Sequence, residues 1–482
     1  MFQRILAWLR KVLSMFASTD IQKSLGIEIA ISGDMETALK LWSDMYADKA
    51  SWLDDDIFSL GLPAAIASQI STVVCLEMKV TIDGSPRADF LTEQFKKVMD
   101  KLRENVELGT AKGGMIFKPY IDDDGLAVDF VQADQFFPVS FDANQKLTAV
   151  IFIDQKIIGK YIYTRVEYHS QGKFADERGV LVDGYQIINK AFRSEDTESL
   201  GIEVQLSEVA EWSDLAPIGT IKNVKQPLFG YYRYPSANNV DSTSPLGVSC
   251  YARAAQVGNN KKSLIQQADE HWSNLLWEFD SGKRALYLDV LAFAKSTDGT
   301  PYLPNKRLYR TLNATSGVDS EEFFQEWSPT FREASLLNGL EAILRKIEYN
   351  CGLAYGIISN PVTVDKTATE FKITQQNFFR TIKDNQKTLQ EALEELIYAM
   401  DVWTTVGKLN PKGTFETAFE FDDSVIVDST AQFQQDLLVL DRVLSRVEFR
   451  VRNYGETEEI AKQKIAMVDL ERQPTELFPP TE

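Results

Sequence analysis

The chain contains 482 residues, of which 51 are basic and 70 acidic, and its formal net charge is -19. With 44% hydrophobic residues it is long enough for about three domains with real cores, which argues against a disordered protein. The negative charge excludes proteins whose affinity for DNA or RNA comes from neutralising its phosphates.

Cysteine and histidine are too scarce for most catalytic or metal chemistry. The three cysteines, Cys75, Cys250 and Cys351, lie far apart and form no metal-type pair, which fits a reduced intracellular compartment and argues against zinc. The two histidines, His169 and His271, lie in unrelated segments, so triads and His-based acid–base schemes lack candidates. We therefore expect no enzymatic activity, no catalytic residues, no metal site and no cofactor.

The first segment, residues 2–16, predicts an amphipathic helix. Its apolar residues are interrupted at helical spacing by Arg4, Arg10 and Lys11, and no small-residue cleavage pattern follows, so a signal peptide is not indicated. Packing against protein is the favoured interpretation, and membrane-surface binding is the alternative. No stretch elsewhere is long and apolar enough to span a bilayer.

Residues 21–108 then have a mostly helical pattern, with an apolar segment from Leu62 to Leu76 that we expect to be buried. The pattern next changes to β. Met115–Tyr120 and Ala127–Val131 form a predicted hairpin around a turn at Asp122–Gly125. Further strands predict a mostly antiparallel sheet inserted into a helical domain: Val150–Asp154, Tyr161–His169 and Tyr185–Phe192.

Two helices that flank a small β-containing segment are predicted next. The first begins at Ser244–Gly247 and ends at Ser281–Gly282, and a strand follows at Lys283–Leu291. The second begins at Ser328–Pro329, where a capping Ser precedes a Pro at the first helical position, and it runs to Gly352.

A long helix without Gly or Pro is predicted from Ala368 to Thr405, and at about 1.5 Å per residue it extends about 57 Å. Thr367 and Thr369 are candidate N-caps, and Gly407 ends the helix. Its apolar residues form one stripe along one face, as they also would in a surface helix over a single core. They are Phe371, Phe378, Ile382, Leu389, Leu393, Leu396, Met400 and Trp403.

The C-terminal part of the chain mixes short strands and helices. Strands are predicted around Phe415–Phe421 and Val425–Val427, and helices at Ala431–Ser445 and Glu456–Leu470. The Pro-rich end, Gln473–Glu482, is predicted to be a mobile tail. Helical and β segments thus alternate irregularly along the chain, which predicts an α+β fold.

Three short motifs look like phosphate-binding or metal-binding sites, but their residues do not match what such sites require. Gly109–Gly114 looks like a phosphate-binding loop, but Met115 follows in place of Lys and Ser/Thr, and a helix precedes it. Asp122–Gly125 lacks the alternating ligands and the later Glu of an EF-hand. Asp54–Asp56 is interpreted as a solvated helix start and not as a paired-carboxylate metal site.

Other short motifs follow one another over nearly the whole chain. They are Gly113-Gly114-Met115 with Lys118-Pro119-Tyr120, Val131-Gln132-Ala133-Asp134-Gln135-Phe136-Phe137-Pro138, Tyr163-Thr164-Arg165, Tyr168-His169, Pro245-Leu246-Gly247-Val248-Ser249, Cys351-Gly352-Leu353, Lys366-Thr367-Ala368-Thr369-Glu370 and the acidic helix after Tyr454-Gly455-Glu456-Thr457-Glu458-Glu459. In this order the set resembles bacteriophage portal proteins of the type found in siphophages and prophages of Gram-positive bacteria.

The resemblance implies an α+β portal fold with a helical and β wing, a two-helix stem, a small α/β clip, a long wing helix with a tunnel loop, and a helical crown. The implied boundaries are 1–244 for the wing, 245–282 and 329–358 for the stem helices, 283–328 for the clip, 359–367 for the tunnel loop, 368–430 for the long helix and the return strands of the wing, and 431–482 for the crown and tail.

The resemblance also implies a function. About twelve copies would form a ring at one capsid vertex, through which double-stranded DNA passes without sequence-specific binding during packaging and ejection. The implied partners are the terminase large subunit, the head-completion adaptor, and the major capsid and scaffold proteins. The implied location is the portal vertex of the virion, and the host cytoplasm during assembly. The implied DNA-channel residues are those of the tunnel loop: Ser359, Asn360, Pro361, Val362, Thr363, Val364, Asp365 and Lys366.

Two other classes of function remain open. A monomeric enzyme needs a cluster of titratable groups in a pocket, for which the sequence offers few candidates. A peripheral membrane or scaffold-type structural protein would use the amphipathic helix at residues 2–16, and this role can coexist with that of a portal.

Overall fold

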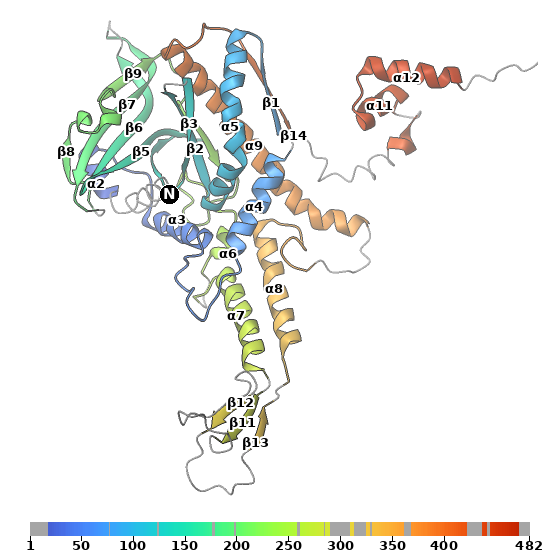
Figure 1. The fold of residues 1–482 in the computed structure, drawn as a ribbon. Coiled ribbons are helices and arrows are strands. Elements are labelled where there is room, and N and C mark those ends of the chain that lie inside the picture. The colour runs from blue at the N-terminus through green and yellow to red at the C-terminus, as the bar shows by residue number, and fades with distance from the viewer. Residues whose placement is uncertain are drawn as a thin grey trace, which may run out of the picture. The chain divides into compact units, whose positions relative to one another are not determined.

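The protein contains both helices and strands, and it divides into two compact units (Figure 1). The first unit comprises the residues up to Leu76 and Val80–Phe419, and the second comprises Glu77–Lys79 and the residues from Glu420 onward. The computed structural model describes residues 18–76, 78–122, 125–175, 179–196, 199–257, 261–283, 285–289, 309–312, 324–327, 330–360, 368–421, 436–440 and 444–471.

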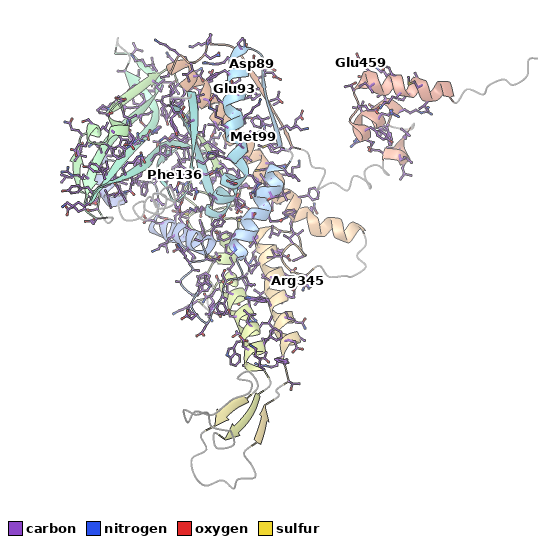
Figure 2. The ribbon with its side chains drawn as sticks, in the orientation of Figure 1. Asp89, Glu93, Met99, Phe136, Arg345 and Glu459 are labelled. Atoms are coloured by element: carbon purple, nitrogen blue, oxygen red, sulfur yellow. The ribbon has the colours of Figure 1, made fainter. Side chains whose placement is uncertain are left out.

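The N-terminal part of the first unit is largely helical, as the sequence predicts. Ser32 caps the second helix, because its Oγ accepts a hydrogen bond from Met35 N. The predicted apolar segment is buried, with Ile66, Ile70 and Val74 fully covered. Asp89 and Glu93 lie on the exposed face of the longest helix of this region (Figure 2). These helices are α2 (Ser18–Leu25), α3 (Gly33–Tyr46), α4 (Leu62–Cys75) and α5 (Pro86–Lys112).

The helical prediction for residues 21–108 is wrong at Met78–Asp83, which form strand β1. β1 pairs with β14 (Glu416–Phe421), so its partner comes from the far end of the chain and leaves no local signal. The helix start predicted at Asp54–Asp56 is also wrong. Asp54 Oδ1 accepts hydrogen bonds from the backbone N–H groups of Asp56 and Ile57, each at 2.8 Å, which makes an Asx turn in the loop before α4.

The predicted hairpin is confirmed as β2 (Gly114–Asp122) and β3 (Gly125–Gln132), and β10 (Gly230–Arg233) pairs with the other edge of β2. Asp123 and Asp124 of its turn lie outside the described residues. A larger antiparallel sheet has the order β4-β5-β6-β7-β8, with β9 also paired to β7, and it contains the three further strands predicted. Its strands are β4 (Phe136–Phe141), β5 (Leu147–Ile158), β6 (Tyr161–Ala175), β7 (Leu181–Ser194), β8 (Ile202–Val204) and β9 (Ile218–Lys222).

The glycine-rich segment Gly109–Gly114 connects a helix to a strand, as predicted. Helix α5 ends at Gly113, which has a φ of +89°, and β2 begins at the next residue. A Cβ on Gly113 would lie 2.5 Å from Gly247 O, so the chain needs glycine here for both its conformation and its close approach to a second segment.

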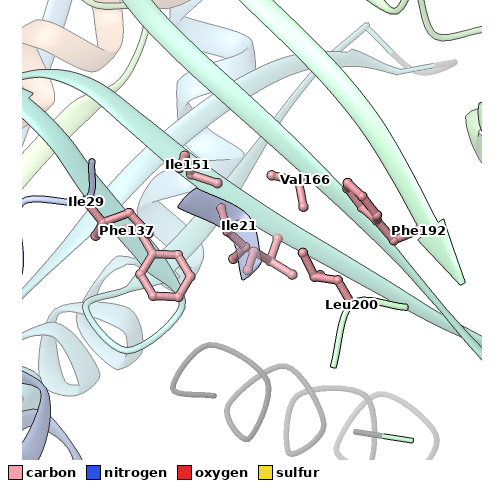
Figure 3. Close-up of a cluster of buried hydrophobic side chains, with 8 residues drawn as sticks. Ile21, Ile29, Phe137, Ile151, Val166, Phe192 and Leu200 are labelled. Atoms are coloured by element: carbon pink, nitrogen blue, oxygen red, sulfur yellow. The ribbon is translucent and has the colours of Figure 1, made fainter. Parts of the chain in front are cut away.

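One hydrophobic core lies where α2 covers the large sheet (Figure 3). Ile21 of α2 is fully buried and packs with side chains from the sheet and from the loop after β7. The other residues of this cluster are Ile29, Phe137, Ile151, Ile153, Val166, Phe192 and Leu200. The alternation of apolar residues along the strands supplies this face, which is why the sequence predicts the strands well.

A buried network of charged groups joins the large sheet to β2 of the three-stranded sheet. Glu167 accepts hydrogen bonds from Lys118 Nζ at 2.6 Å and from His169 Nε2 at 2.8 Å, and Arg165 lies 3.3 Å from its second oxygen. The hydroxyl of Tyr185 lies 2.8 Å from His169 Nδ1. One histidine of the chain is thus part of a structural network between strands.

The first predicted stem helix is shorter than expected. Residues 245–251 are not helical, α6 (Ala252–Ala255) is a single turn, and α7 (Leu264–Ser281) begins only after Ser263. The reason is local capping, because Ser263 Oγ accepts a hydrogen bond from Gln266 N at 3.1 Å. The predicted end at Ser281–Gly282 is confirmed.

The second predicted stem helix, α8 (Glu333–Cys351), begins later than Ser328–Pro329, which lie outside the described residues. The residue before it, Arg332, is held by α7: its backbone N–H donates to Glu278 Oε1 at 3.0 Å, and its guanidinium forms an ion pair with Glu278 at 2.7 Å. These bonds hold Arg332 outside the helix and join the two helices at this end. The predicted end at Gly352 is confirmed.

Between these helices, the described residues form a three-stranded sheet. β11 (Ala285–Asp289) is parallel to β12 (Tyr309–Leu312) and antiparallel to β13 (Phe324–Trp327). The strand predicted at Lys283–Leu291 is therefore confirmed over its described part.

The long helix is confirmed as α9 (Ala368–Val406), which ends one residue beyond its predicted end. Most of its predicted stripe is buried: Ile382, Leu389, Leu393, Leu396 and Met400 are at most 1% exposed. Phe378 and Trp403 are only partly buried, and the side chain of Phe371 is outside the described part.

The described residues of the second unit include the helices α11 (Arg446–Tyr454) and α12 (Glu458–Glu471), and residues 436–439 are also helical. The helix predicted at Ala431–Ser445 is confirmed at residues 436–439, but its predicted end is wrong, because Ser445 caps the next helix, α11, through a capping box with Glu448. α12 confirms the helix predicted at Glu456–Leu470. The elements predicted at residues 2–16, 425–427 and 473–482 lie outside the described residues.

The buried network makes the first unit sensitive to acid. Burial would raise the pKa of Glu167, but Lys118, His169 and Arg165 outweigh it and hold this pKa well below 4.5. Burial also lowers the pKa of His169 below 6.5, against the opposing effect of Glu167. For both groups the unfolded chain binds the proton more tightly, so stability is present at neutral pH and falls as the pH drops.

We therefore expect the free energy of unfolding in urea to fall between pH 7 and pH 5, with a slope of at most about 1.4 kcal/mol per pH unit from one proton. His169→Gln should lower stability at pH 7 and flatten this slope. His271→Gln, in a histidine on α7 outside the network, is the matched control. An unchanged slope in His169→Gln would show that this imidazole does not carry the effect.

Candidate functional site

The described part of the predicted tunnel loop follows α8 after a short non-helical segment, Gly352–Ile358. Ser359 and Asn360 are described, whereas Pro361, Val362, Thr363, Val364, Asp365 and Lys366 lie outside the described residues. The described part of the site therefore consists of the end of α8, the segment Leu353–Asn360 and the residues that hold α9 in place.

Gly352 turns the chain back at the end of α8. Its φ of +69° is left-handed, and Leu353 N donates to Glu348 O at 2.9 Å, which closes the last turn of the helix. A Cβ on Gly352 would collide with Thr381 Oγ1 of α9, so only glycine allows this close approach. The turn thus places the following segment between α8 and α9.

Glu348 anchors this segment to α8. Its side chain is fully buried, and its Oε1 accepts hydrogen bonds from the backbone N–H groups of Gly356 at 3.0 Å, Ile358 at 2.8 Å and Ser359 at 2.9 Å. Its Oε2 accepts a fourth hydrogen bond from Ser359 Oγ at 2.8 Å. The segment therefore forms a cradle of backbone donors around one carboxylate.

Glu341 makes a second contact further along the segment. Its carboxylate accepts hydrogen bonds from Asn360 N at 3.1 Å and from Asn360 Nδ2 at 2.9 Å. Asn360 is exposed and Glu341 is half-buried, so water competes for this contact. The two carboxylates together hold the segment over two turns of α8.

The hydrogen bonds of Glu348 and of Glu341 stabilise the segment by different amounts of free energy. A hydrogen bond to a charged group contributes about 1.5–3 kcal/mol, and a buried polar group that loses its partner costs about as much. Glu348 lies in the last turn of α8, where the helix dipole disfavours a negative charge, so the carboxylate depends on its four donors. An exposed contact such as that of Glu341 is worth about 0.5–1.5 kcal/mol.

The middle of α9 is held by strand β10. A Cβ on Gly230 would collide with Ala392 O of the helix backbone, so the strand and the helix are in close contact at this point. Tyr232 OH donates to Asn385 Oδ1 at 2.7 Å, and Asn385 Nδ2 donates to Thr381 O at 2.7 Å. These contacts hold the buried side of α9 against β10.

The C-terminal end of α9 is held by Arg87 of α5, which is 1% exposed. Its guanidinium donates to Asp401 Oδ1 at 2.7 Å, to Asp401 O at 3.1 Å and to Asn410 O at 2.8 Å, and it also contacts Thr405 Oγ1. A cation at this position is favourable because the last carbonyl groups of a helix carry negative charge. Arg87 thus ends and positions the long helix.

The polar face of α9 borders two cavities. One has a volume of about 1040 Å³ and is bordered by Glu391, Glu394 and Glu395. Glu395 is paired with Lys146 at 2.9 Å, so part of this face contacts the loop between β4 and β5 of the large sheet. The other has a volume of about 300 Å³ and includes Arg380.

The second cavity also includes two cysteines but no reactive thiol. Burial raises the pKa of Cys351 to about 12 and that of Cys250 well above its usual range. Both thiols therefore stay protonated at neutral pH, and a protonated thiol is a poor nucleophile and a poor metal ligand. The described residues contain no group of three or more His, Cys, Asp or Glu side chains that could hold a metal ion. In the same part of the chain, no helix is long and apolar enough to cross a membrane.

The sequence prediction of the loop did not include its anchors, Glu348 and Glu341. A signal for Glu348 exists, because it continues the apolar series of Leu340, Leu344 and Ile347 on the buried face of α8. A carboxylate on such a face needs donors close to it. Nothing in the spacing indicates that these donors are the backbone N–H groups that follow Gly352.

Comparison with known families gives one match. The family described as Phage portal protein, SPP1 Gp6-like, matches residues 60–465, which is most of the chain. No curated protein matches the chain.

Arg87→Met should destabilise the protein, because it keeps the aliphatic volume but leaves Asp401 and the carbonyl groups at the end of α9 without their donor. We expect a loss of about 3 kcal/mol in the free energy of unfolding, at the lower end for a buried ion pair, since Asp401 is 31% exposed and can be hydrated. Urea titration measures this loss.

Arg103→Met, in the same helix, is the matched control. Arg103 is 50% exposed and lies 3.6 Å from Glu107, so its loss should change stability by less than about 1 kcal/mol. Equal losses in the two variants would contradict the positioning role of Arg87.

Proposed function

The chain belongs to the phage portal protein family, and we propose that it forms a ring at one vertex of the capsid through which double-stranded DNA is packaged and ejected. The observation that carries this proposal is the family match over most of the chain. The role of the protein is structural in this proposal, without enzymatic activity.

We assign the regions of the chain to the parts of a portal as the resemblance implies. Residues 1–244 form the wing, 283–328 the clip, 368–430 the long helix and return strands of the wing, and 431–482 the crown and tail. The stem consists of the regions 245–282 and 329–358, whose helical cores are α7 and α8. The paired helices, with a separate three-stranded sheet between them in sequence, support this division.

The tunnel loop, residues 359–367, faces the DNA in this proposal. Its described base is held on α8 by Glu348 and Glu341, so the loop begins at a defined place between two long helices. A ring of about twelve chains carries roughly -230 formal charges, so DNA in the channel meets little net attraction and can slide. Lys366 is next to Asp365 in the sequence, which limits any phosphate contact to a modest one.

We propose four kinds of protein partner besides further copies of the chain. The clip region docks the terminase large subunit during packaging and the head-completion adaptor afterwards. The major capsid and scaffold proteins contact the ring where it joins the shell. The protein is located at the portal vertex of the virion and in the host cytoplasm during assembly.

Electron microscopy of the purified protein should show rings with about twelve- or thirteenfold symmetry, because a portal acts only as a closed ring. Mass photometry of the same sample should give a mass of about twelve chains. A protein that stays monomeric over the whole range of salt, pH and concentration would refute the proposal.

Lys366→Ala should change the amount of packaged DNA by less than about twofold, because a single phosphate contact adds little in a strongly negative channel. Deletion of residues 362–365 should lower packaging much more. Packaging into proheads in vitro measures both, and Lys96→Ala, at an exposed position on α5, is the control. A complete loss of packaging in Lys366→Ala would show that the loop binds DNA strongly.

A further inference from the structure

We infer that Glu348 is a positioning residue whose carboxylate fixes the place at which the chain leaves α8 for the DNA-facing loop. The inference rests on the proposed function only for the role of the loop. The anchoring itself is a property of the single chain and can be measured on the purified protein.

The first observation is the path of the chain. Glu341 and Glu348 are seven residues apart on α8, about two turns, so their side chains lie on the same side of the helix. The chain reverses at Gly352 and runs back along this side, where Gly356–Ser359 meet Glu348 and Asn360 meets Glu341. The loop therefore leaves the helix at a point fixed by two carboxylates.

The second observation is the difference in burial between the two contacts. Glu348 is 0% exposed and Ser359 is 5% exposed, whereas Asn360 is exposed. Opening the inner contact, that of Glu348, leaves a buried charge and three backbone N–H groups without partners. Opening the outer contact, that of Glu341 with Asn360, only replaces the donors of the protein with water. The inner contact is thus the fixed one, and Glu341 only extends it.

The third observation is that one carboxylate oxygen accepts three hydrogen bonds. Glu348 Oε1 is bound by Gly356 N, Ile358 N and Ser359 N, a pattern that favours a negative charge. A neutral amide oxygen can occupy the same place but attracts these donors less strongly. An apolar side chain of the same size cannot accept them.

α8 also links the segment to the rest of the stem. At its other end, the adjoining Arg332 is paired with Glu278 of α7 at 2.7 Å. Arg345, between the two carboxylates in sequence, is exposed on α8 (Figure 2). The side of α8 that carries Glu348 thus holds the segment, while other side chains of the same helix face solvent. In the proposed portal, α8 and the base of the loop move as one body.

Hydrogen–deuterium exchange on the full-length protein tests the anchoring. Glu348→Met should raise the exchange rates of the amides of Gly356, Ile358 and Ser359 by at least about tenfold, and Glu348→Gln should raise them less. Glu333→Met, in the first turn of the same helix, is the matched control and should leave these amides unchanged. Unchanged rates in Glu348→Met would overturn the inference.

Two milder variants cover the case in which Glu348→Met does not fold. Ser359→Ala removes only the hydrogen bond to Oε2, and it should raise the exchange of the segment by a smaller factor. Glu341→Gln should affect Asn360 and leave Gly356 and Ile358 protected. If Glu341→Gln exposes the whole segment while Ser359→Ala does not, the assignment of Glu348 as the fixed anchor is wrong.

DNA packaging by rings of these variants tests this inference separately from the proposed function. Rings that Glu348→Met still forms should package less DNA than wild-type rings, and Glu348→Gln should restore part of this loss. Wild-type packaging by Glu348→Met rings with exposed amides would overturn the positioning role. If wild-type rings do not package DNA at all, the proposed function fails, and the exchange result still decides the anchoring.

Discussion

The junction between α8 and α9 depends on one buried carboxylate. Glu348 lies in the last turn of α8, where the helix dipole and the lack of water both disfavour a negative charge. Four donors from the next eleven residues offset this cost, and three of them belong to the backbone. The sharp turn at Gly352 follows from the same arrangement, because only a chain that reverses at once can bring these donors to the helix. The junction is therefore a single cooperative unit.

The long helix approaches the end of α8 closely at Thr381, next to Gly352, and is held by Arg87 at its C-terminal end. A helix of 39 residues bends or frays unless tertiary contacts hold it along its length. β10 provides the central contact through Gly230, whose missing side chain lets the strand lie against the helix backbone. Since Arg87 binds both Asp401 and Asn410, the end of α9 and the chain that leaves it are held together. The position of the helix is thus determined by polar contacts at particular residues, and its stability by the buried stripe.

The sequence predicts the elements with strong periodicity and misses those that depend on distant partners. α9 and the long strands were predicted well, because their apolar residues repeat at the period of a helix or a strand. β1 was missed because its partner β14 lies near the other end of the chain. α7 was predicted too long, because residues 245–263 were included in it, whereas the helix begins only after the capping Ser263. The anchor at Glu348 could not be predicted, since its donors are backbone groups that carry no sequence signal.

The order of charged residues along α9 bears on how subunits of the proposed ring contact one another. The exposed face of this helix carries Arg380, Lys383, Asp384 and Lys387 in the half nearer the loop, and Glu391 and Glu394 beyond them. A ring is built from contacts between two different surfaces of each subunit, and strongly acidic subunits repel one another unless local pairs of opposite charge offset this repulsion. A helix that presents both signs on one face can supply such pairs. Part of this face is paired within the chain, as Glu395 is with Lys146, and we propose that in the ring its outward-facing charges contact a neighbouring subunit.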